Sequence, residues 1–381
     1  MKILFHCADY PPMVSGVAGY IRNMAKALVD AGHAALVVTR RAPGFAEESN
    51  DEGITVFRKY DRSEAGTARV ADLVLGIARE NKIDVIEGAD HIGECAPVMK
   101  MRQSIPIHIK VHACQVVKVL RDSQINYPWQ RITLALAFLR VHRQISNERY
   151  SIEHADLISV PTRRLVEELR KQGLRLSRSL AVIPNPIVDP APSPVEMAGM
   201  PTVLFAGRIE FGKGIRFLPG IIRDVVRSVP GATLEMAGAD SYARGVGSIR
   251  AWLERRLGDV GANVRFLGEL DPAGMDHALR RAWVVIVPSL WDNFPNIVLE
   301  AMIRGKSIVT TPHGGMPEML ENTGCPIVPP DSSEFGREVV RFLEDRQLMN
   351  RVGTACRERA LREYSPGAIL PRYLQFLESH K

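Results

Sequence analysis

Residues 203–214 have the sequence VLFAGRIEFGKG, in which a short apolar run leads into a glycine-rich, basic loop. Parallel α/β sheets bind ligands beyond the carboxyl ends of their strands, so a loop in this position is a candidate site. Glycines let the backbone approach an anion closely, while Arg208 and Lys213 add a guanidinium fork and a point charge. The stretch predicts a strand followed by a diphosphate-binding loop; the ordinary alternative is a surface turn with solvated cations.

Short apolar runs alternate with helix-period stretches on both sides of this loop, which is typical of parallel β-α-β units. At 381 residues the chain is long enough for two domains. Prolines gather between residues 184 and 201, where they favour a linker. We therefore expect two doubly wound α/β domains, residues 1–188 and 201–365, joined by a linker at 189–200. Strands are predicted at 3–5, 35–39, 84–87, 105–111, 203–206, 233–236, 264–267, 284–287 and 307–311.

The composition, 46% hydrophobic and 24% charged, is that of a folded globular protein. No uncharged apolar run reaches the about 18 residues that a membrane-spanning helix needs. The N-terminus begins with a strand pattern rather than a signal peptide. The five cysteines are scattered and form no CxxC, so they predict neither a disulfide framework nor a zinc site. These features predict a cytoplasmic protein.

A second candidate segment, WDNFPNIVLEAM at residues 291–302, follows the strand predicted at 284–287. Asp292 lies in the loop, and Glu300 comes eight residues later, inside a helix expected to begin near Asn296. Carboxylates accept paired hydrogen bonds from diols, so the two acids could hold sugar and ribose hydroxyls. Taken alone, the pattern is better explained by acids that stabilise a helix N-terminus.

The first loop of the chain, YPPMVSGVAG at residues 10–19, is a weaker candidate in which Ser15 and Gly16 permit close approach of an anion. It lacks the GxGxxG spacing of dinucleotide-binding enzymes. Residues 305–307 (GKS) look like the end of a P-loop, but Glu300 stands where the first glycine would be. The sequence also contains no DxD, HExxH or GxSxG motif, so the enzyme classes that these motifs define are not indicated.

Taken together, these segments resemble the retaining glycosyltransferases of the family-4 group (glycosyl transferases group 1), and the match runs nearly end to end. The family has the GT-B fold, two Rossmann-like domains facing each other across a cleft. Residues 207–214 are similar to its "GR…KG" element, and Asp292 and Glu300 match the spacing of its E-x7-E element. Further similarities are residues 181–185 (AVIPN), 314–318 (GGMPE), Ser15-Gly16, His112 at the end of a strand, and a C-terminal helix at about 366–381 that would pack back on the first domain.

The resemblance implies a role for each matching residue and a retaining, metal-independent reaction that uses no cofactor beyond the nucleotide-sugar substrate. The commonest donors in the family are UDP-sugars, with GDP-sugars next. The implied catalytic residues are Arg208, Lys213 and His112; the implied donor-binding residues are Ser15, Gly16, Gly207, Asp292, Asn293, Phe294, Pro295 and Glu300. Without the resemblance, His112 would be read as a structural histidine.

Departures from the family pattern affect the sugar side of the predicted site. Asp292 replaces the usual Glu and shortens the reach by one methylene, and Asn293 and Pro295 stand where glycines are common. Two other enzymatic or binding functions remain open: a sugar-nucleotide epimerase or hydrolase of the same fold, and a sugar-nucleotide-binding protein without activity. The donor base, sugar, acceptor, linkage and oligomeric state are not determined by the sequence.

The acceptor is expected to be a glycan or a lipid-linked molecule, as in polysaccharide biosynthesis. Residues 100–149 contain nine Lys or Arg and two acids, a balance of +7, interspersed with apolar side chains such as Trp129 and Phe138. This mixture suits peripheral contact with an anionic membrane surface, at the inner face of the membrane. An ordinary helix that packs its Leu and Phe inward explains the pattern equally well. No nucleic-acid-binding module accompanies the charge.

Overall fold

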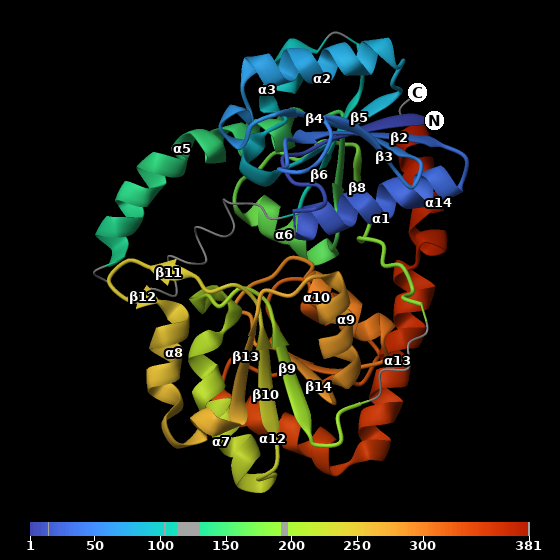
Figure 1. Ribbon diagram of the computed structural model, residues 1–381. Coiled ribbons are helices and arrows are strands. Elements are labelled where there is room, and N and C mark those ends of the chain that lie inside the picture. The colour runs from blue at the N-terminus through green and yellow to red at the C-terminus, as the bar shows by residue number, and fades with distance from the viewer. Residues whose placement is uncertain (14, 103, 113–129, 192–196, 380–381) are drawn as a thin grey trace. The chain divides into compact units, whose positions relative to one another are not determined.

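The computed structural model divides into two compact units, Met1–Pro186 with Pro366–Lys381 (unit 1) and Ile187–Ser365 (unit 2). It describes the backbone of all residues except 14, 103, 113–129, 192–196 and 380–381 (Figure 1). Side chains are also not described for Ile92 and residues 130–141. The side chains in much of the basic stretch 100–149 therefore lie outside the described residues.

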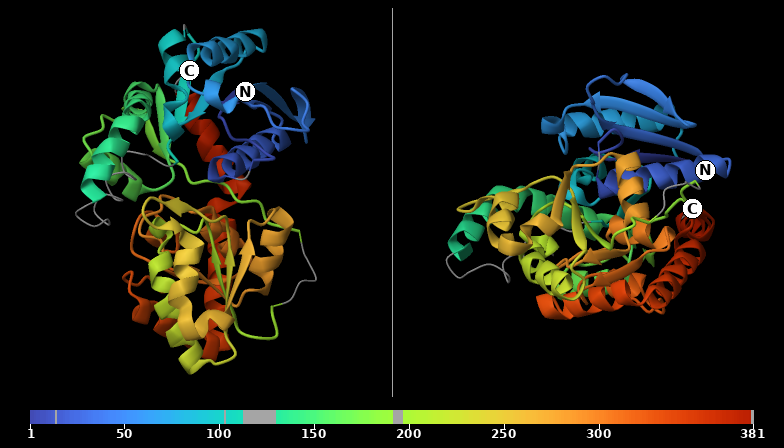
Figure 2. Two further views of the ribbon diagram at one scale, coloured as in Figure 1. Left: turned by 60° about the vertical axis from the view of Figure 1, so that its left-hand side comes forward. Right: turned by 60° about the horizontal axis from the view of Figure 1, so that its bottom comes forward.

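Unit 1 is built on an eight-stranded sheet in the order β3-β4-β2-β1-β5-β6-β7-β8, parallel except for the β3–β4 pair. Helices α2 and α3 cover one face, and α1 and α14 the other (Figures 1 and 2). The strands are β1 (Lys2–His6), β2 (Ala34–Arg40), β3 (Glu48–Asp51), β4 (Ile54–Tyr60), β5 (Val85–Ala89), β6 (Ile107–Lys110), β7 (Leu157–Val160) and β8 (Leu180–Val182). The helices are α1 (Gly16–Asp30), α2 (Ala68–Glu80), α3 (Ala96–Met101), α5 (Gln130–His154), α6 (Arg163–Lys171) and α14 (Pro366–Glu378).

Unit 2 has a five-stranded parallel sheet in the order β13-β10-β9-β14-β15, together with a separate two-stranded hairpin, β11 and β12. Its strands are β9 (Thr202–Ala206), β10 (Thr233–Ala237), β11 (Tyr242–Ala243), β12 (Gly247–Ser248), β13 (Val264–Gly268), β14 (Val284–Val287) and β15 (Ser307–Thr310). Its helices are α7 (Leu218–Ser228), α8 (Ile249–Leu257), α9 (Pro272–Arg281), α10 (Asn296–Ile303), α11 (Met316–Met319), α12 (Ser332–Glu344) and α13 (Arg346–Tyr364). The two parallel sheets with helices between their strands confirm the predicted α/β class.

The strands of the structure differ in several places from those predicted. Strands β3, β4, β7, β11 and β12 were not predicted, and β6 is shorter than the strand predicted at residues 105–111. The alternating isoleucines of residues 105–111 predicted a strand, and β6 does form there, but all four of its residues are buried. Because helices cover both faces of a parallel sheet, both sides of such a strand are removed from water. The alternation therefore does not mark a buried face and an exposed face.

In each sheet the strand order reverses next to the first strand, between β1 and β5 in unit 1 and between β9 and β14 in unit 2. Loops that leave the carboxyl ends of two such strands diverge and leave a crevice between them. The predicted site residues follow these strands: Ser15 and Gly16 come after β1, residues 207–214 after β9, and Asp292 after β14. The topology therefore places the candidate residues at the positions where open α/β sheets bind ligands.

A buried acid holds the loop between β1 and α1. Glu94 Oε2 accepts a hydrogen bond from the Ala8 amide at 2.8 Å, and Arg40 Nε donates to the Ala8 carbonyl at 3.2 Å. Glu94 is only 3% exposed, and burial raises its pKa to about 7. Because an unfolded glutamate titrates near its ordinary pKa, the folded protein binds this proton more tightly than the unfolded chain.

We expect the stability of unit 1 to fall as pH rises from about 4.5 to about 7, by up to about 3 kcal/mol from Glu94 alone. The E94Q variant carries no titrating proton there and should lose this pH dependence. Chemical denaturation at pH 5 and pH 8 measures the free energy of unfolding of both proteins. Relative to the wild type, E94Q should be more stable at pH 8 than at pH 5. The exposed acid Glu80 at the end of α2 supplies the control E80Q. Parallel pH profiles for E94Q and the wild type would contradict the assignment.

Helix α13 crosses the end of α10 with backbone against backbone. A Cβ at Gly353 would lie 2.0 Å from the carbonyl oxygen of Gly305, and backbone cannot move aside cheaply. Gly76 in α2 differs because a Cβ there would meet no atom within 4 Å. The two helical glycines thus separate a packing requirement from helix propensity.

The G353A variant should be destabilised by about 1–3 kcal/mol or more, because overpacking forces the two helices apart. The G76A variant should instead be stabilised by about 0.5–1 kcal/mol, since alanine loses less conformational entropy in a helix than glycine. Thermal and denaturant unfolding measure both changes. Changes of the same sign in the stabilities of G353A and G76A would refute this explanation.

Candidate functional site

The loop after β9 is fixed against β10 by its backbone. The Gly207 amide donates to the Ala237 carbonyl at 2.9 Å, which continues the strand pairing into the loop. Gly238 has φ +147°, and a Cβ there would lie 2.0 Å from the Gly207 carbonyl oxygen. Gly214 has φ +78°, and its Cβ would lie 2.0 Å from the Pro288 carbonyl oxygen. Glycine is therefore required where this loop contacts its two neighbouring strand ends.

The structure brings Lys213 and Asp292 together. Lys213 Nζ donates to Asp292 Oδ2 at 2.5 Å, although the residues are 79 positions apart in the chain. Both side chains remain partly accessible, at 26% and 18% of their surface. The Leu290 amide donates to the Gly212 carbonyl at 2.9 Å, so backbone also connects the two loops. Unit 2 thus presents an ammonium and a carboxylate side by side at the ends of β9 and β14.

Arg208 lies on the same loop but projects further into solvent. Its side chain is 59% exposed, and Nη2 contacts Glu210 Oε1 at 3.1 Å. Exposed ion pairs contribute only about 0–1 kcal/mol, so this contact would not prevent the guanidinium from turning to an anionic ligand. The loop that carries Lys213 therefore has a second, exposed cation.

A third loop contacts the Asp292 backbone. The Asp292 carbonyl oxygen accepts a hydrogen bond from the Gly315 amide at 2.8 Å. At Gly314, where φ is +65°, a Cβ would lie 1.8 Å from the same oxygen. Loops after β9, β14 and β15 are consequently joined at Asp292. The resemblance had indicated residues 314–318, but this backbone contact could not be predicted from the sequence.

Helix α10 begins at Asn296, as predicted, directly after the remaining candidate residues of the loop. Asn293 Oδ1 accepts a hydrogen bond from Trp291 Nε1 at 2.8 Å, and the buried Phe294 ring packs edge-on against Tyr364 at 5.7 Å. Pro295 is the N-cap residue and has no side-chain group to bond the first helical amides. These contacts fix the backbone of the loop that leads into α10.

Glu300 lies one turn inside α10, and burial raises its pKa. The neighbouring Arg304, whose guanidinium also donates to the Glu300 carbonyl at 2.9 Å, opposes this shift. A partly buried carboxyl group of this kind accepts hydrogen bonds from hydroxyl groups well, since few water molecules compete for it. Among the described residues, no hydrogen bond or ion pair joins Glu300 to Lys213.

Unit 1 holds the other predicted site residues. Ser15 is the N-cap of α1, where its hydroxyl accepts a hydrogen bond from the Ala18 amide at 3.1 Å, and Gly16 is the first helical residue. His112 follows β6, and its amide donates to Asp90 Oδ1 at 2.8 Å. Its ring packs edge-on against Tyr20 at 4.7 Å, and burial lowers its pKa well below the usual value. The imidazole is therefore neutral at physiological pH.

The sequence did not predict one group of contacts around residues 207–214, which we call the cation loop. The Phe211 ring contacts Trp252 of α8, at 4.9 Å between centroids. Edge-to-face aromatic pairs are not visible from sequence when the partners belong to different elements.

Two further findings concern the described part of the chain. It contains no group of three or more His, Cys, Asp or Glu side chains placed to hold a metal ion. None of its helices combines the length and the apolar character that crossing a bilayer requires.

Comparison with known proteins gives matches along most of the chain. Residues 200–345 match the family "Glycosyl transferases group 1", and residues 15–186 match the family "Glycosyl transferase 4-like domain". The chain is 25% identical to a glycogen synthase of Mycobacterium tuberculosis over 399 aligned positions, covering 96% of this chain and 91% of that protein. It is 28% identical to the phosphatidyl-myo-inositol mannosyltransferase of the same organism, covering 55% of this chain and 57% of that protein.

Solved structures with the same fold include a sucrose-phosphate synthase from Thermosynechococcus elongatus, with a TM-score of 0.79 at 19% identity over 99% of this chain and 98% of that one. HepE from Anabaena, solved in complex with UDP and glucose, has a TM-score of 0.73 at 18% identity over the whole of both chains. The two family matches, one in each unit, and these structural neighbours agree with each other. The chain belongs to the group 1 glycosyltransferases and has their GT-B fold of two Rossmann-like domains.

Proposed function

We propose that this glycosyltransferase moves a hexosyl group from a UDP-sugar to a glycan or a lipid-linked acceptor, with retention of anomeric configuration and without a metal ion. The observation that carries the proposal is the Lys213 ammonium, held 2.5 Å from Asp292 beside the glycine loop of unit 2. An ammonium and an exposed guanidinium on a glycine-rich loop suit a diphosphate. The UDP complex of HepE, a structural neighbour, supports the choice of nucleotide.

In the proposed reaction the bond between sugar C1 and the diphosphate oxygen breaks, and its electron pair stays on that oxygen. Arg208 and Lys213 stabilise the negative charge that develops there, which is the largest catalytic contribution available to side chains of this kind. The acceptor hydroxyl forms the new bond to C1 from the same face, and its proton passes to the leaving phosphate oxygen. No protein carboxylate needs to act as a nucleophile.

The other candidate residues take binding roles in this proposal. Asp292, with the loop residues Asn293, Phe294 and Pro295, is assigned to the sugar, and Glu300 to the ribose. Gly207 allows the diphosphate to approach the backbone. From unit 1 we assign His112, Ser15 and Gly16 to the sugar and acceptor side of the reaction. The neutral state of His112 suits hydrogen bonding to a hydroxyl rather than stabilisation of an anion.

Removal of either cation should weaken nucleotide binding and lower the rate. We expect R208A and K213A each to reduce kcat/KM by about 10²-fold, as for the loss of one preorganised donor. A thermal-shift panel of UDP-, GDP- and ADP-sugars identifies the donor, because a ligand stabilises the fold that binds it. The control is R227A, which removes an exposed arginine paired with Asp224 on α7. Unchanged UDP affinity in both R208A and K213A would disprove the diphosphate site.

Incubation with the donor alone separates the transferase from the other functions of the fold. A transferase should turn over slowly until an acceptor is added, because closure of such sites protects the donor from water. Rapid hydrolysis or formation of an epimerised sugar without acceptor would favour the epimerase or hydrolase. Tight binding with no product under any condition would favour an inactive binding protein.

We also propose that unit 1 contacts an anionic membrane surface through the basic stretch 100–149. Arg143 and Arg149 within it are exposed. Vesicles that contain phosphatidylglycerol should sediment the protein at low salt, and phosphatidylcholine vesicles should not. About 0.5 M salt should release it, because screening weakens attraction between exposed charges. Failure to bind anionic vesicles at low salt would exclude this contact.

A further inference from the structure

The segment between β10 and β13 contains a hairpin and a helix that lie against the flank of the cation loop. The Ile209 amide donates to the Ala239 carbonyl at 2.9 Å, and Ile209 also pairs with Asp240 in an isolated parallel bridge. The hairpin of β11 and β12 and helix α8 follow directly. The backbone of this segment is thus continuous with one side of residues 207–214.

Asp240 fastens the hairpin and the start of α8 to this point. Its carboxylate accepts hydrogen bonds from Ser248 Oγ at 2.6 Å and from the Arg250 amide at 2.9 Å. Ser248 in turn caps α8 by accepting from the Ala251 amide at 2.9 Å. Desolvation opposes the charge of Asp240, but these donors hold its pKa below the usual range. The beginning of α8 is therefore fixed relative to the cation loop.

From α8, Trp252 reaches the short 3-10 turn η3 (Phe211–Lys213) that carries the Lys213 ammonium. Its ring meets Phe211 edge to face, at 4.9 Å and an interplanar angle of 85°. Arg256 lies over the Trp252 ring at 4.0 Å, and Arg216 lies 5.5 Å from the Phe211 ring centroid. The two rings are thus held in a row of four side chains. This row immobilises the first residue of the turn.

The position of Lys213 is determined at two points. Asp292 holds the ammonium at the tip of the side chain, while the turn fixes the backbone from which it starts. A lysine side chain has four rotatable bonds, so after a shift of the turn these bonds must readjust, and the ammonium then presents its free donors to a ligand from a different position and direction. A misplacement of about 1 Å can cost about 10²-fold in rate where geometry is preorganised.

We propose that Trp252 is a positioning residue for Lys213, acting through Phe211 to hold the ammonium where the donor diphosphate binds. This inference rests on the proposed function. Trp252 and Phe211 are both only partly buried and pack against the edge of the core of unit 2. Their contact acts on the geometry of the turn.

The test is a double-mutant cycle read by UDP affinity in calorimetry. UDP carries the charge that develops on the leaving group. Its dissociation constant therefore measures how well the site around Lys213 binds the diphosphate, and no acceptor is needed. We expect K213A to weaken UDP binding by about 10-fold or more and W252A by about 5- to 10-fold. W252F keeps an aromatic edge toward Phe211 and should stay within about 2-fold of the wild type. In the K213A background, W252A should cause no further loss, because coupled residues are not additive.

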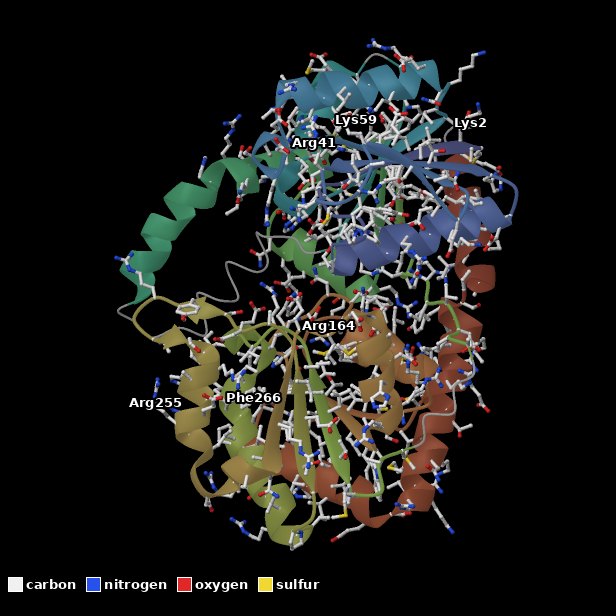
Figure 3. All side chains as sticks on the ribbon, viewed as in Figure 1. Lys2, Arg41, Lys59, Arg164, Arg255 and Phe266 are labelled. Carbon is white, nitrogen blue, oxygen red and sulfur yellow. The ribbon has the colours of Figure 1, made fainter. Side chains whose placement is uncertain are left out.

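A matched control is available on the same helix. Arg255 projects from the outer side of α8, whereas Arg250 of that helix lies over Phe266 of β13 (Figure 3). R255A should therefore leave UDP affinity and the melting temperature unchanged. Equal loss from W252A with and without Lys213, or no rescue by W252F, would overturn the positioning role. If K213A instead bound UDP as tightly as the wild type, the proposed function would be wrong. The role of Trp252, which rests on it, would then also be wrong.

Discussion

The ion pair between Lys213 and Asp292 is the contact on which the candidate site of unit 2 depends. It joins the loops after β9 and β14, whose strands flank the point where the strand order of unit 2 reverses. Both partners remain partly open to water, so the pair stabilises the fold only modestly and can be rearranged by a ligand. The same proximity that pairs the two charges leaves an ammonium available to an incoming anion and a carboxylate available to hydroxyl groups.

Backbone contacts hold the loops that carry this ion pair more rigidly than contacts between side chains would. Gly214 touches the Pro288 carbonyl, and Gly314 touches that of Asp292, so the three loops meet without an intervening side chain. Atoms in such contacts cannot give way by rotamer changes. The positions of the loops therefore follow from the sheet, and the accessible side chains of Lys213, Arg208 and Asp292 are the parts left free to respond to a ligand.

The sequence predicted those parts of this arrangement that depend on local pattern. The five strands of the parallel sheet in unit 2 and the start of α10 at Asn296 follow from apolar runs and from the residues that precede a helix. Partners far apart in the chain were not predicted: Lys213 and Asp292 are 79 positions apart, and the packing of Trp252 on Phe211 crosses from one element to another. Periodicity reports which face of an element is apolar, but it carries no information on which loops meet. The family resemblance placed the charged residues on the correct loops, while the contacts between them required the fold.

In unit 1 the surroundings of His112 determine its charge. Its pKa is lowered by burial first and by the neighbouring Lys110 next, so it remains neutral over the physiological range. Lys110 is itself buried, and burial lowers its pKa to about 7. Unit 1 therefore has a neutral imidazole at the end of β6, whereas unit 2 has accessible cations at the end of β9. That division suits a reaction in which the nucleotide portion gains negative charge as it leaves, while the sugar and the acceptor present mainly hydroxyl groups.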